Sequence, residues 1–280
     1  MAKLLVTGAN GFLAYRLCSY YHNRGWNVAG KTHREMDFTD GDAVRSVFCM
    51  ERPDVVIHAG AISDISACAR EPERSRQVNV EGSRQIALAC HEIGARLILC
   101  SSDQVYMGNG VAEPHREEGE ELCPPTLYAN QKLEAERLCM ELHPDTVCLR
   151  LPWMFAADIR EGEHGNLVTN VRRSVERGEK VRFPVYDYRS ITDVWDVVRN
   201  MEAAFSIPPG IYNFGSENHF STYQVAEILF EAMGWDRQLL ERNEEAFADR
   251  PRNLRMDMGK AGKAGIRFCS TEEAIRRLQR

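Results

Sequence analysis

Tyr128 and Lys132 have the side chains and the spacing for proton transfer to a ketone. They are four positions apart in a segment of helical character, 126–142, and side chains at that spacing share one face of a helix. A phenol has an ordinary pKa of about 10, and a neighbouring ammonium group lowers it by stabilising the phenolate. Such a tyrosine can donate or accept a proton near neutral pH, as ketone reduction requires. The pair alone is a weak signal, so its weight depends on what accompanies it.

A serine precedes this pair where it could orient the same carbonyl group. Ser101-Ser102-Asp103 stands at the end of the apolar run 96–101, which is typical of a buried strand. The carboxyl ends of parallel strands form the ligand-binding edge of an open α/β sheet. Ser102 is therefore a candidate hydrogen-bond donor to a substrate. Such a serine alone more often satisfies loop backbone, so we interpret it together with Tyr128 and Lys132.

A glycine-punctuated turn near the N-terminus predicts a dinucleotide site. Residues 3–7 have the pattern of a buried strand, and residues 12–21 carry apolar side chains at helical spacing. Between them, Gly8 permits a tight turn, and Gly11 lets the backbone approach a pyrophosphate at the helix N-terminus. The third position of the motif, which requires a small residue, is Ala14. The place of this turn after the first strand favours a cofactor site.

The residues after the second predicted strand, 26–31, bear on the choice of cofactor. NAD-preferring enzymes place an acidic residue at this strand end, where it accepts a hydrogen bond from the ribose 2′-hydroxyl. Here Thr32, His33 and Arg34 follow the strand, and the first acid is Glu35. Cationic and hydroxyl groups suit a 2′-phosphate. We therefore predict NADPH, with NADH as the alternative.

The order of strand and helix patterns predicts the architecture. Strands and helices alternate from residue 3 to about residue 155, which is typical of an α/β fold with a Rossmann-type doubly wound parallel sheet. We expect an NAD(P)-binding domain over 1–155 and a smaller C-terminal α/β substrate lobe over 156–280, part of which returns to the sheet. The other predicted elements are strands at 54–58, 146–150, 181–183 and 210–215, and helices at 39–51 (capped by Thr39), 75–91, 166–177, 194–205 and 221–233.

Composition argues against several classes of function. The chain has 280 residues, 44% of them hydrophobic, and a net charge of −6, which disfavours a nucleic-acid surface. No run approaches the roughly 18 apolar residues of a membrane span, and no signal peptide precedes the first strand, so we expect a cytoplasmic protein. The nine cysteines are scattered, and we interpret them as small residues of a reducing cytosol. No His/Cys/Asp cluster has metal spacing, so we expect no metal in the chemistry.

Taken in this order, the motifs resemble the extended short-chain dehydrogenase/reductase superfamily. Within it, the chain is most similar to the dTDP-4-dehydrorhamnose reductase branch of sugar-nucleotide reductases. The resemblance extends over nearly the whole chain and rests on the segments 7–13, 58–61, 79–82, 101–106, 128–134, 149–155, 189–194, 210–213 and 250–253. The strand-end serine and Tyr-x-x-x-Lys segments are specific to the superfamily, whereas the looser C-terminal segments decide the branch.

The resemblance implies hydride transfer from a reduced nicotinamide to a 4-keto-6-deoxy sugar nucleotide. Tyr128 would be the general acid, Lys132 would tune it and bind the nicotinamide ribose, and Ser102 would orient the carbonyl. The implied cofactor-binding residues are Gly8, Asn10, Gly11, Phe12, Leu13, Arg34, Asp37, Phe38, Ala59, Gly60, Ala61, Asn79, Ser101, Tyr128 and Lys132. The implied substrate-binding residues are Asp103, Gln104, Trp153 and Arg189. By resemblance alone, the expected partners are a nucleotide sugar and a second copy of the chain, with no nucleic acid or membrane.

Gln104 departs from the pattern of related sugar-nucleotide dehydratases, which carry Thr-Asp-Glu where this chain has Ser102-Asp103-Gln104. An amide cannot abstract a proton, so dehydration is disfavoured. Reductases of the branch more often carry an aromatic residue at this position, which leaves the exact substrate open. A nucleotide-sugar epimerase and a non-catalytic NADP-binding regulatory subunit are the alternatives. The intact Ser102, Tyr128 and Lys132 favour catalysis.

Overall fold

The computed structural model describes residues 2–110 and 112–279, and their contacts form two compact units. The first, here called the sheet unit, comprises the residues up to Val105, Cys123–Arg150 and Met201–Tyr212. The second, the lobe unit, comprises Tyr106–Leu122, Leu151–Asn200 and the residues from Asn213 onward. The division therefore does not follow a single cut after residue 155. The stretch 106–122, which links Ser102 to Tyr128 in the chain, belongs to the lobe unit.

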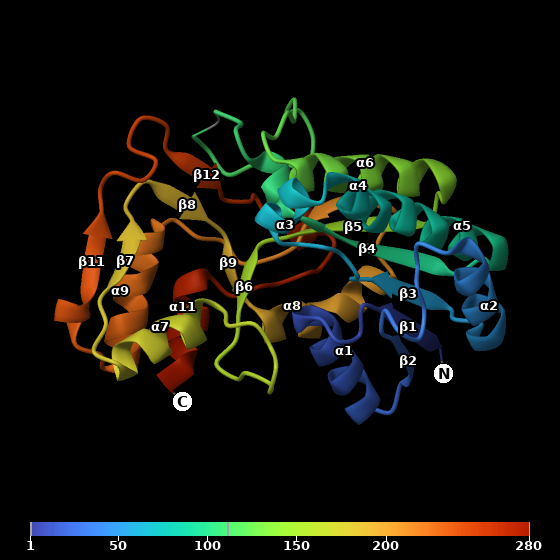
Figure 1. The fold of residues 1–280 in the computed structure, drawn as a ribbon, viewed down its shortest axis with the longest axis horizontal. Coiled ribbons are helices and arrows are strands. Elements are labelled where there is room, and N and C mark those ends of the chain that lie inside the picture. The colour runs from blue at the N-terminus through green and yellow to red at the C-terminus, as the bar shows by residue number, and fades with distance from the viewer. Residues whose placement is uncertain (1, 111, 280) are drawn as a thin grey trace. The chain divides into compact units, whose positions relative to one another are not determined.

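A six-stranded parallel sheet organises the sheet unit, in the order β10-β5-β4-β3-β1-β2 (Figure 1). Its strands are β1 (Lys3–Thr7), β2 (Asn27–Lys31), β3 (Val55–His58), β4 (Arg96–Ser102), β5 (Thr146–Leu151) and β10 (Gly210–Asn213). β1 pairs in parallel with β2 on one side and β3 on the other, so the winding direction reverses between β1 and β3. Ligands of such sheets bind beyond the carboxyl ends of the strands at this reversal. The predicted doubly wound fold is confirmed.

Helices cover both faces of this sheet (Figure 1). They are α1 (Phe12–Asn23), α2 (Gly41–Glu51), α3 (Ile65–Arg70), α4 (Pro72–Arg76), the π-helix η1 (Gln77–Gly82), α5 (Ser83–Ile93), the 3₁₀ helix η2 (Asp103–Tyr106), α6 (Leu127–Leu142) and the 3₁₀ helix η3 (Met201–Phe205). One face carries α2, α5 and α6, whose Phe48, Ile86 and Cys139 belong to one core cluster. On the other face, the rings of Tyr21 on α1 and Phe205 pack against each other, with their centroids 5.9 Å apart. Burial of apolar side chains on both faces is what stabilises a parallel sheet.

The cap of one predicted helix differs from the prediction, for a local reason. Asp40, not Thr39, caps α2: its carboxylate accepts hydrogen bonds from the backbone of Asp42 and Ala43. The Thr39 hydroxyl donates to Asp37 instead, at 2.7 Å.

The helix predicted over 75–91 is not continuous. The π-helix η1 separates α4 from α5 and contains Asn79. Such π-segments widen one turn and often occur at functional sites. The helix predicted over 194–205 also changes type, because its α-helical part ends at Asn200 and η3 follows.

Short parallel strand pairs and amphipathic helices form the lobe unit (Figure 1). The strands are β6 (Trp153–Phe155), β7 (Val181–Pro184), β8 (Asp187–Arg189), β9 (Ile191–Asp193), β11 (Leu240–Asn243) and β12 (Arg252–Leu254), and the helices are α7 (Leu167–Glu176), α8 (Val194–Asn200), α9 (Thr222–Met233), η4 (Arg237–Leu239), α10 (Gly259–Lys263), α11 (Thr271–Arg276) and η5 (Arg277–Gln279). The pairs are β6–β9, β7–β11 and β8–β12. Phe155, Val168 and Leu229 lie fully buried in its core. Within the described residues, no helix has the length and apolar character needed to cross a membrane.

Candidate active site

The predicted glycine turn packs directly against the loop after β3. Gly8 has a φ of +68°, and the Gly11 amide donates to the Gly8 carbonyl at 2.7 Å. A Cβ atom at Gly8 would lie 2.7 Å from the Cα atom of Gly60, so only glycine fits there. The two loops that meet here flank the point where the winding of the sheet reverses. This is the arrangement that receives a dinucleotide in doubly wound sheets.

A buried histidine ties these strands together. The Nδ1 atom of His58 lies 2.7 Å from the Thr7 hydroxyl, and its Nε2 atom lies 3.1 Å from the Ser83 hydroxyl. Burial lowers the pKa of His58 to about 3, so the ring is neutral at neutral pH. It links β1, β3 and α5.

Phe38, a predicted cofactor-binding residue, fills the space beside two glycines. A Cβ atom at Gly60 or at Gly82 would lie 2.5 Å from the Phe38 ring. The ring also meets His58 edge-on, with a centroid distance of 5.1 Å. Phe38 thus packs against Gly60 in the loop Ala59-Gly60-Ala61.

Asn79 clamps the same loop through its side chain. Its Oδ1 atom accepts from the Ile62 amide at 2.8 Å, and its Nδ2 atom donates to the Ile62 carbonyl at 3.0 Å. The Nδ2 atom also donates to Gln131 on α6 at 2.8 Å. Asn79 is only 1% exposed. In this arrangement its amide shapes the loop after β3 and ties that loop to the helix that carries Lys132.

Carboxylates hold several side chains near the end of β2. The Lys31 ammonium group pairs with Glu51 at 2.5 Å. The Glu35 carboxylate accepts from both the amide and the hydroxyl of Thr32, at 2.9 and 2.7 Å. Arg34 is exposed. These hydrogen bonds hold the pKa of Glu35 below its ordinary value, so an anionic group also stands at this strand end, close to the predicted 2′-phosphate site.

Tyr128 and Lys132 both lie on α6, four residues apart on one face, and both are buried. Thr126 caps this helix by accepting from the Ala129 amide, which fixes its first turn. Tyr128 is 7% exposed and Lys132 is 4% exposed. Within the part of the chain that the structure describes, no hydrogen bond or ion pair satisfies the Lys132 ammonium group. A buried ammonium group that lacks such partners is suited to bind the hydroxyls of a ligand.

Burial dominates the electrostatics of Tyr128. It raises the pKa of Tyr128 above the ordinary phenol value, hydrogen bonding with the Ser102 hydroxyl lowers it, and the charge of Asp103 raises it. The expectation that Lys132 brings this pKa below its ordinary value is wrong for this structure, because desolvation outweighs the neighbouring charges. The phenol consequently keeps its proton at neutral pH, as a general acid must.

Ser102, Asp103 and Gln104 form a compact hydrogen-bonded group at the end of β4. The Ser102 hydroxyl donates to the Asp103 carboxylate at 3.3 Å and accepts from the Gln104 amide at 3.2 Å. The Gln104 side chain donates to the same Asp103 oxygen at 3.1 Å. Gln104 therefore helps to hold Asp103 in place. The Ser102 hydroxyl also forms a hydrogen bond with Tyr128.

Ser101, the other serine at this strand end, faces a buried ion pair. Its hydroxyl donates to Glu136 of α6 at 2.5 Å. Arg150 of β5 donates to both carboxylate oxygens of Glu136, at 3.1 and 2.8 Å. Both side chains of the pair are 3% exposed. The sequence interpretation missed Glu136 and Arg150, although the four-residue spacing from Lys132 to Glu136 was available as a signal.

The predicted substrate-binding residues Trp153 and Arg189 contact each other within the lobe unit. The Arg189 guanidinium lies 5.2 Å from the centre of the Trp153 ring. Asp187 pairs with Arg189 at 3.3 Å, and Arg252 donates to both Asp187 oxygens at 2.7 Å. We call Trp153, Asp187, Arg189 and Arg252 the arginine cluster. The sequence interpretation also missed Asp187, because no local spacing links it to Arg252.

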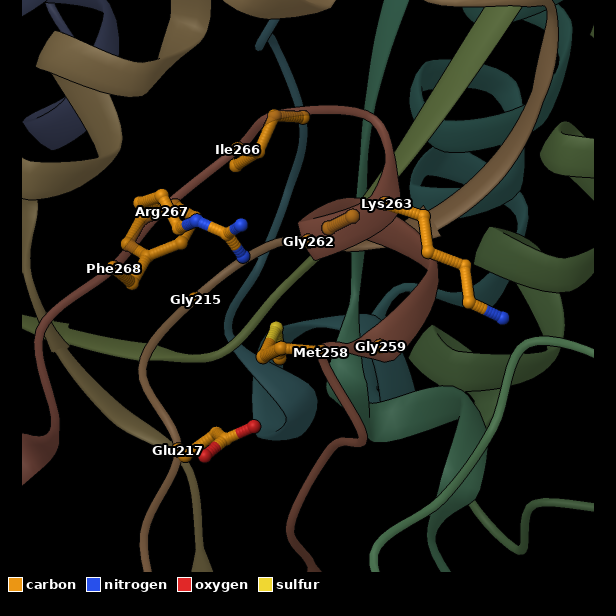
Figure 2. Close-up of a pocket in the computed structure, with 10 residues that line it drawn as sticks. Gly215, Glu217, Met258, Gly259, Gly262, Lys263, Ile266, Arg267 and Phe268 are labelled. Carbon is orange, nitrogen blue, oxygen red and sulfur yellow. The ribbon is translucent and has the colours of Figure 1, made fainter.

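The lobe unit also contains a pocket of about 490 Å³ whose lining includes no residue of the arginine cluster. Figure 2 shows its lining, which is Gly215, Glu217, Met258, Gly259, Ala261, Gly262, Lys263, Ile266, Arg267 and Phe268. Glu217, Lys263 and Arg267 provide its charged side chains, and none of the predicted site residues lines it. Over residues 2–110 and 112–279, no group of three or more His, Cys, Asp or Glu side chains could hold a metal ion.

Comparison with known proteins identifies the family. The model of the RmlD substrate binding domain family matches residues 2–279. A dTDP-4-dehydrorhamnose reductase of Streptomyces griseus is 38% identical over 84% of this chain and 77% of its own length. The spore coat polysaccharide biosynthesis protein SpsK of Bacillus subtilis is 29% identical over 99% of this chain and 96% of its own length. The solved dTDP-4-dehydrorhamnose reductase of Bacillus anthracis, in complex with NADP, shares the fold with a TM-score of 0.89 at 22% identity, over 99% of this chain and 96% of that one. The chain therefore belongs to the RmlD substrate binding domain family, within the extended short-chain dehydrogenases/reductases.

Proposed function

We propose that the protein reduces a 4-keto-6-deoxy sugar nucleotide with NADPH, in the manner of a dTDP-4-dehydrorhamnose reductase. The observation that carries the proposal is the juxtaposition of Ser102 with a buried, protonated Tyr128 one helical turn from Lys132. A scaffold that only binds a nucleotide needs no such arrangement. The Streptomyces griseus relative carries the same activity in its name.

The residues present fit a nicotinamide cofactor. In the described structure, α1 begins after Gly11 without a side-chain cap, so the backbone N–H groups of its first turn suit a pyrophosphate. Lys132 offers a buried ammonium group to the ribose hydroxyls. Arg34 offers an exposed cation to a 2′-phosphate, which favours NADPH. The neighbouring Glu35 carboxylate leaves NADH as a second cofactor.

The roles of the side chains follow from their geometry. When bound, NADPH supplies the hydride that reduces the carbonyl carbon. Tyr128 gives its proton to the carbonyl oxygen, because the raised pKa keeps that proton in place until the oxygen becomes basic. Ser102 donates a hydrogen bond to the same oxygen and is oriented by the Gln104 backbone amide. Lys132 stabilises the phenolate that forms once the proton has left.

The lobe unit supplies substrate recognition in this proposal. Arg189 would bind the diphosphate of the nucleotide sugar, and the Trp153 ring would pack on the sugar. Their mutual contact supports a joint role, because it orients the guanidinium group and the ring with respect to each other. A cytoplasmic location and a homodimer are further parts of the proposal and rest on the family resemblance.

The test is NADPH oxidation, followed by absorbance, with dTDP-4-keto-6-deoxy-L-mannose. We expect turnover by the wild type and a loss of about 10²–10⁴-fold in kcat for Tyr128→Phe, the range for removal of a general acid. Tyr20→Phe is the matched control, because Tyr20 lies on α1 beside Arg24 and has no part in the proposed chemistry. Tight NADPH binding without oxidation of any 4-keto sugar nucleotide would instead support the regulatory-subunit alternative.

A further inference from the structure

Glu136 continues the row of functional side chains on α6. Tyr128, Lys132 and Glu136 follow one another at four-residue intervals and therefore lie on one face of the helix. All three are buried, and Glu136 is 2% exposed. A carboxylate is rarely buried to this extent unless it has dedicated partners.

The partners of Glu136 come from the two strands beneath the helix. Ser101 belongs to β4, next to Ser102, and Arg150 lies near the end of β5. Glu136 accepts one hydrogen bond from Ser101 and a bidentate pair from Arg150. Bidentate pairs of this kind fix orientation as well as distance. The contact thus sets the position of α6, and with it Lys132, against the strand that carries Ser102.

The charges around Lys132 give Glu136 a second effect. The titratable groups whose charges act on Lys132 include His58 from β3, Cys68 from α3, Cys100 from β4, Glu136 and Cys139 from α6, and Cys148 from β5. Tyr128, one turn away on the same face of α6, keeps its proton, and Arg150 is paired with Glu136. Burial keeps the histidine neutral and raises the pKa values of the four thiols, so these groups carry no charge at neutral pH. Glu136 is the one carboxylate among them. It opposes the burial that lowers the pKa of Lys132.

We infer that Glu136 is a positioning residue that holds the Lys132 side chain in place and in its ammonium form for the cofactor. The inference rests on the proposed function, because it takes the ribose of NADPH as the ligand of Lys132. Glu136 touches neither substrate nor cofactor in this account. It acts through Lys132, and a merely structural role would leave the protonation of Lys132 unchanged.

The experiment measures NADPH affinity as a function of pH, by cofactor fluorescence, for the wild type, Glu136→Gln and Glu134→Gln. Glu134 is the matched control, because it lies on the same helix but pairs with Arg76 at the surface. Loss of the Glu136 charge makes the ammonium form less favourable. The pH at which binding weakens on the alkaline side should therefore fall by about one unit in Glu136→Gln, and Kd above that pH should rise up to about tenfold. The control should match the wild type.

A midpoint unchanged in folded Glu136→Gln, as judged by circular dichroism, would overturn the inference. If Glu136→Gln does not fold, Glu136→Asp carries the test. Its charge is one methylene further from Lys132, so a smaller shift in the same direction is expected, and no shift would again overturn the inference. A wild type that binds NADPH but reduces no ketosugar refutes the proposed reaction and leaves the Glu136 test intact. A wild type that binds no NADPH at any pH refutes both.

Discussion

Two buried groups of charged side chains, one in each unit, are assembled in different ways. In the sheet unit, Tyr128, Lys132 and Glu136 come from a single helix at regular spacing. In the lobe unit, the arginine cluster draws Trp153, Asp187, Arg189 and Arg252 from three short strands, β6, β8 and β12. Among the residues that the structure describes, Lys132 of the first group has no ion-pair partner, whereas in the second group a single carboxylate pairs with two guanidinium groups.

The two groups should differ in how strongly their geometry responds to substitutions elsewhere in the chain. A helix fixes the relative positions of Tyr128, Lys132 and Glu136 through its own backbone, so the spacing within this row depends little on distant residues. The arginine cluster depends on Asp187, because without this carboxylate two guanidinium groups would repel each other at a site of low exposure. The spacing of this row should therefore be robust, and the geometry of the arginine cluster should be sensitive to one residue.

Among the changes that test this comparison, the largest effect is expected for Asp187→Asn. The change leaves Arg189 and Arg252 without their shared carboxylate. The Asp187 side chain is 3% exposed but that of Arg252 is 22% exposed, so we discount the full cost of a broken buried pair to about 2 kcal/mol in the free energy of unfolding. Urea denaturation measures it. Glu241→Gln, which removes an exposed partner of Lys180, should leave the urea midpoint unchanged, and an equal effect of the two changes would contradict the special role of Asp187.

A smaller effect is expected for Arg189→Ala. If the guanidinium binds the diphosphate of the substrate, its loss should raise KM for the nucleotide sugar about tenfold, the value of one hydrogen bond to a charged group. The kcat value should change little, because Tyr128 and Lys132 lie in the sheet unit. Steady-state kinetics with the nucleotide sugar measure both values, and Arg173→Ala on the exposed face of α7 is the control. An unaffected KM would remove Arg189 from the substrate site.

The smallest effect is expected for Arg34→Ala, which extends the comparison to an exposed cation. An exposed ion pair is worth at most about 1 kcal/mol, so the preference for NADPH over NADH should fall about fivefold. Measured Kd values for both cofactors test this, with Arg45→Ala on α2 as the control. An unchanged ratio would show that another group recognises the 2′-phosphate.

Local patterns predicted the parts of the site that one element builds. The four-residue spacing of Tyr128 and Lys132 and the glycine turn before α1 need only helix and turn geometry, and both occur where expected. The direction of the pKa shift of Tyr128 was predicted wrongly. Spacing shows which charges are near, but the extent of desolvation depends on everything packed around the phenol.

By itself, the sequence determined the alternating fold, the glycine turn before α1 and the four-residue spacing of Tyr128 and Lys132, because periodicity and turn chemistry act over a few residues. Only the tertiary structure decided the partners of Glu136, the clamp that Asn79 forms on Ile62 and the shared carboxylate of Asp187. Those contacts join residues up to 65 positions apart, and no local pattern encodes them. Their energies depend on burial, which exists only once the chain has folded.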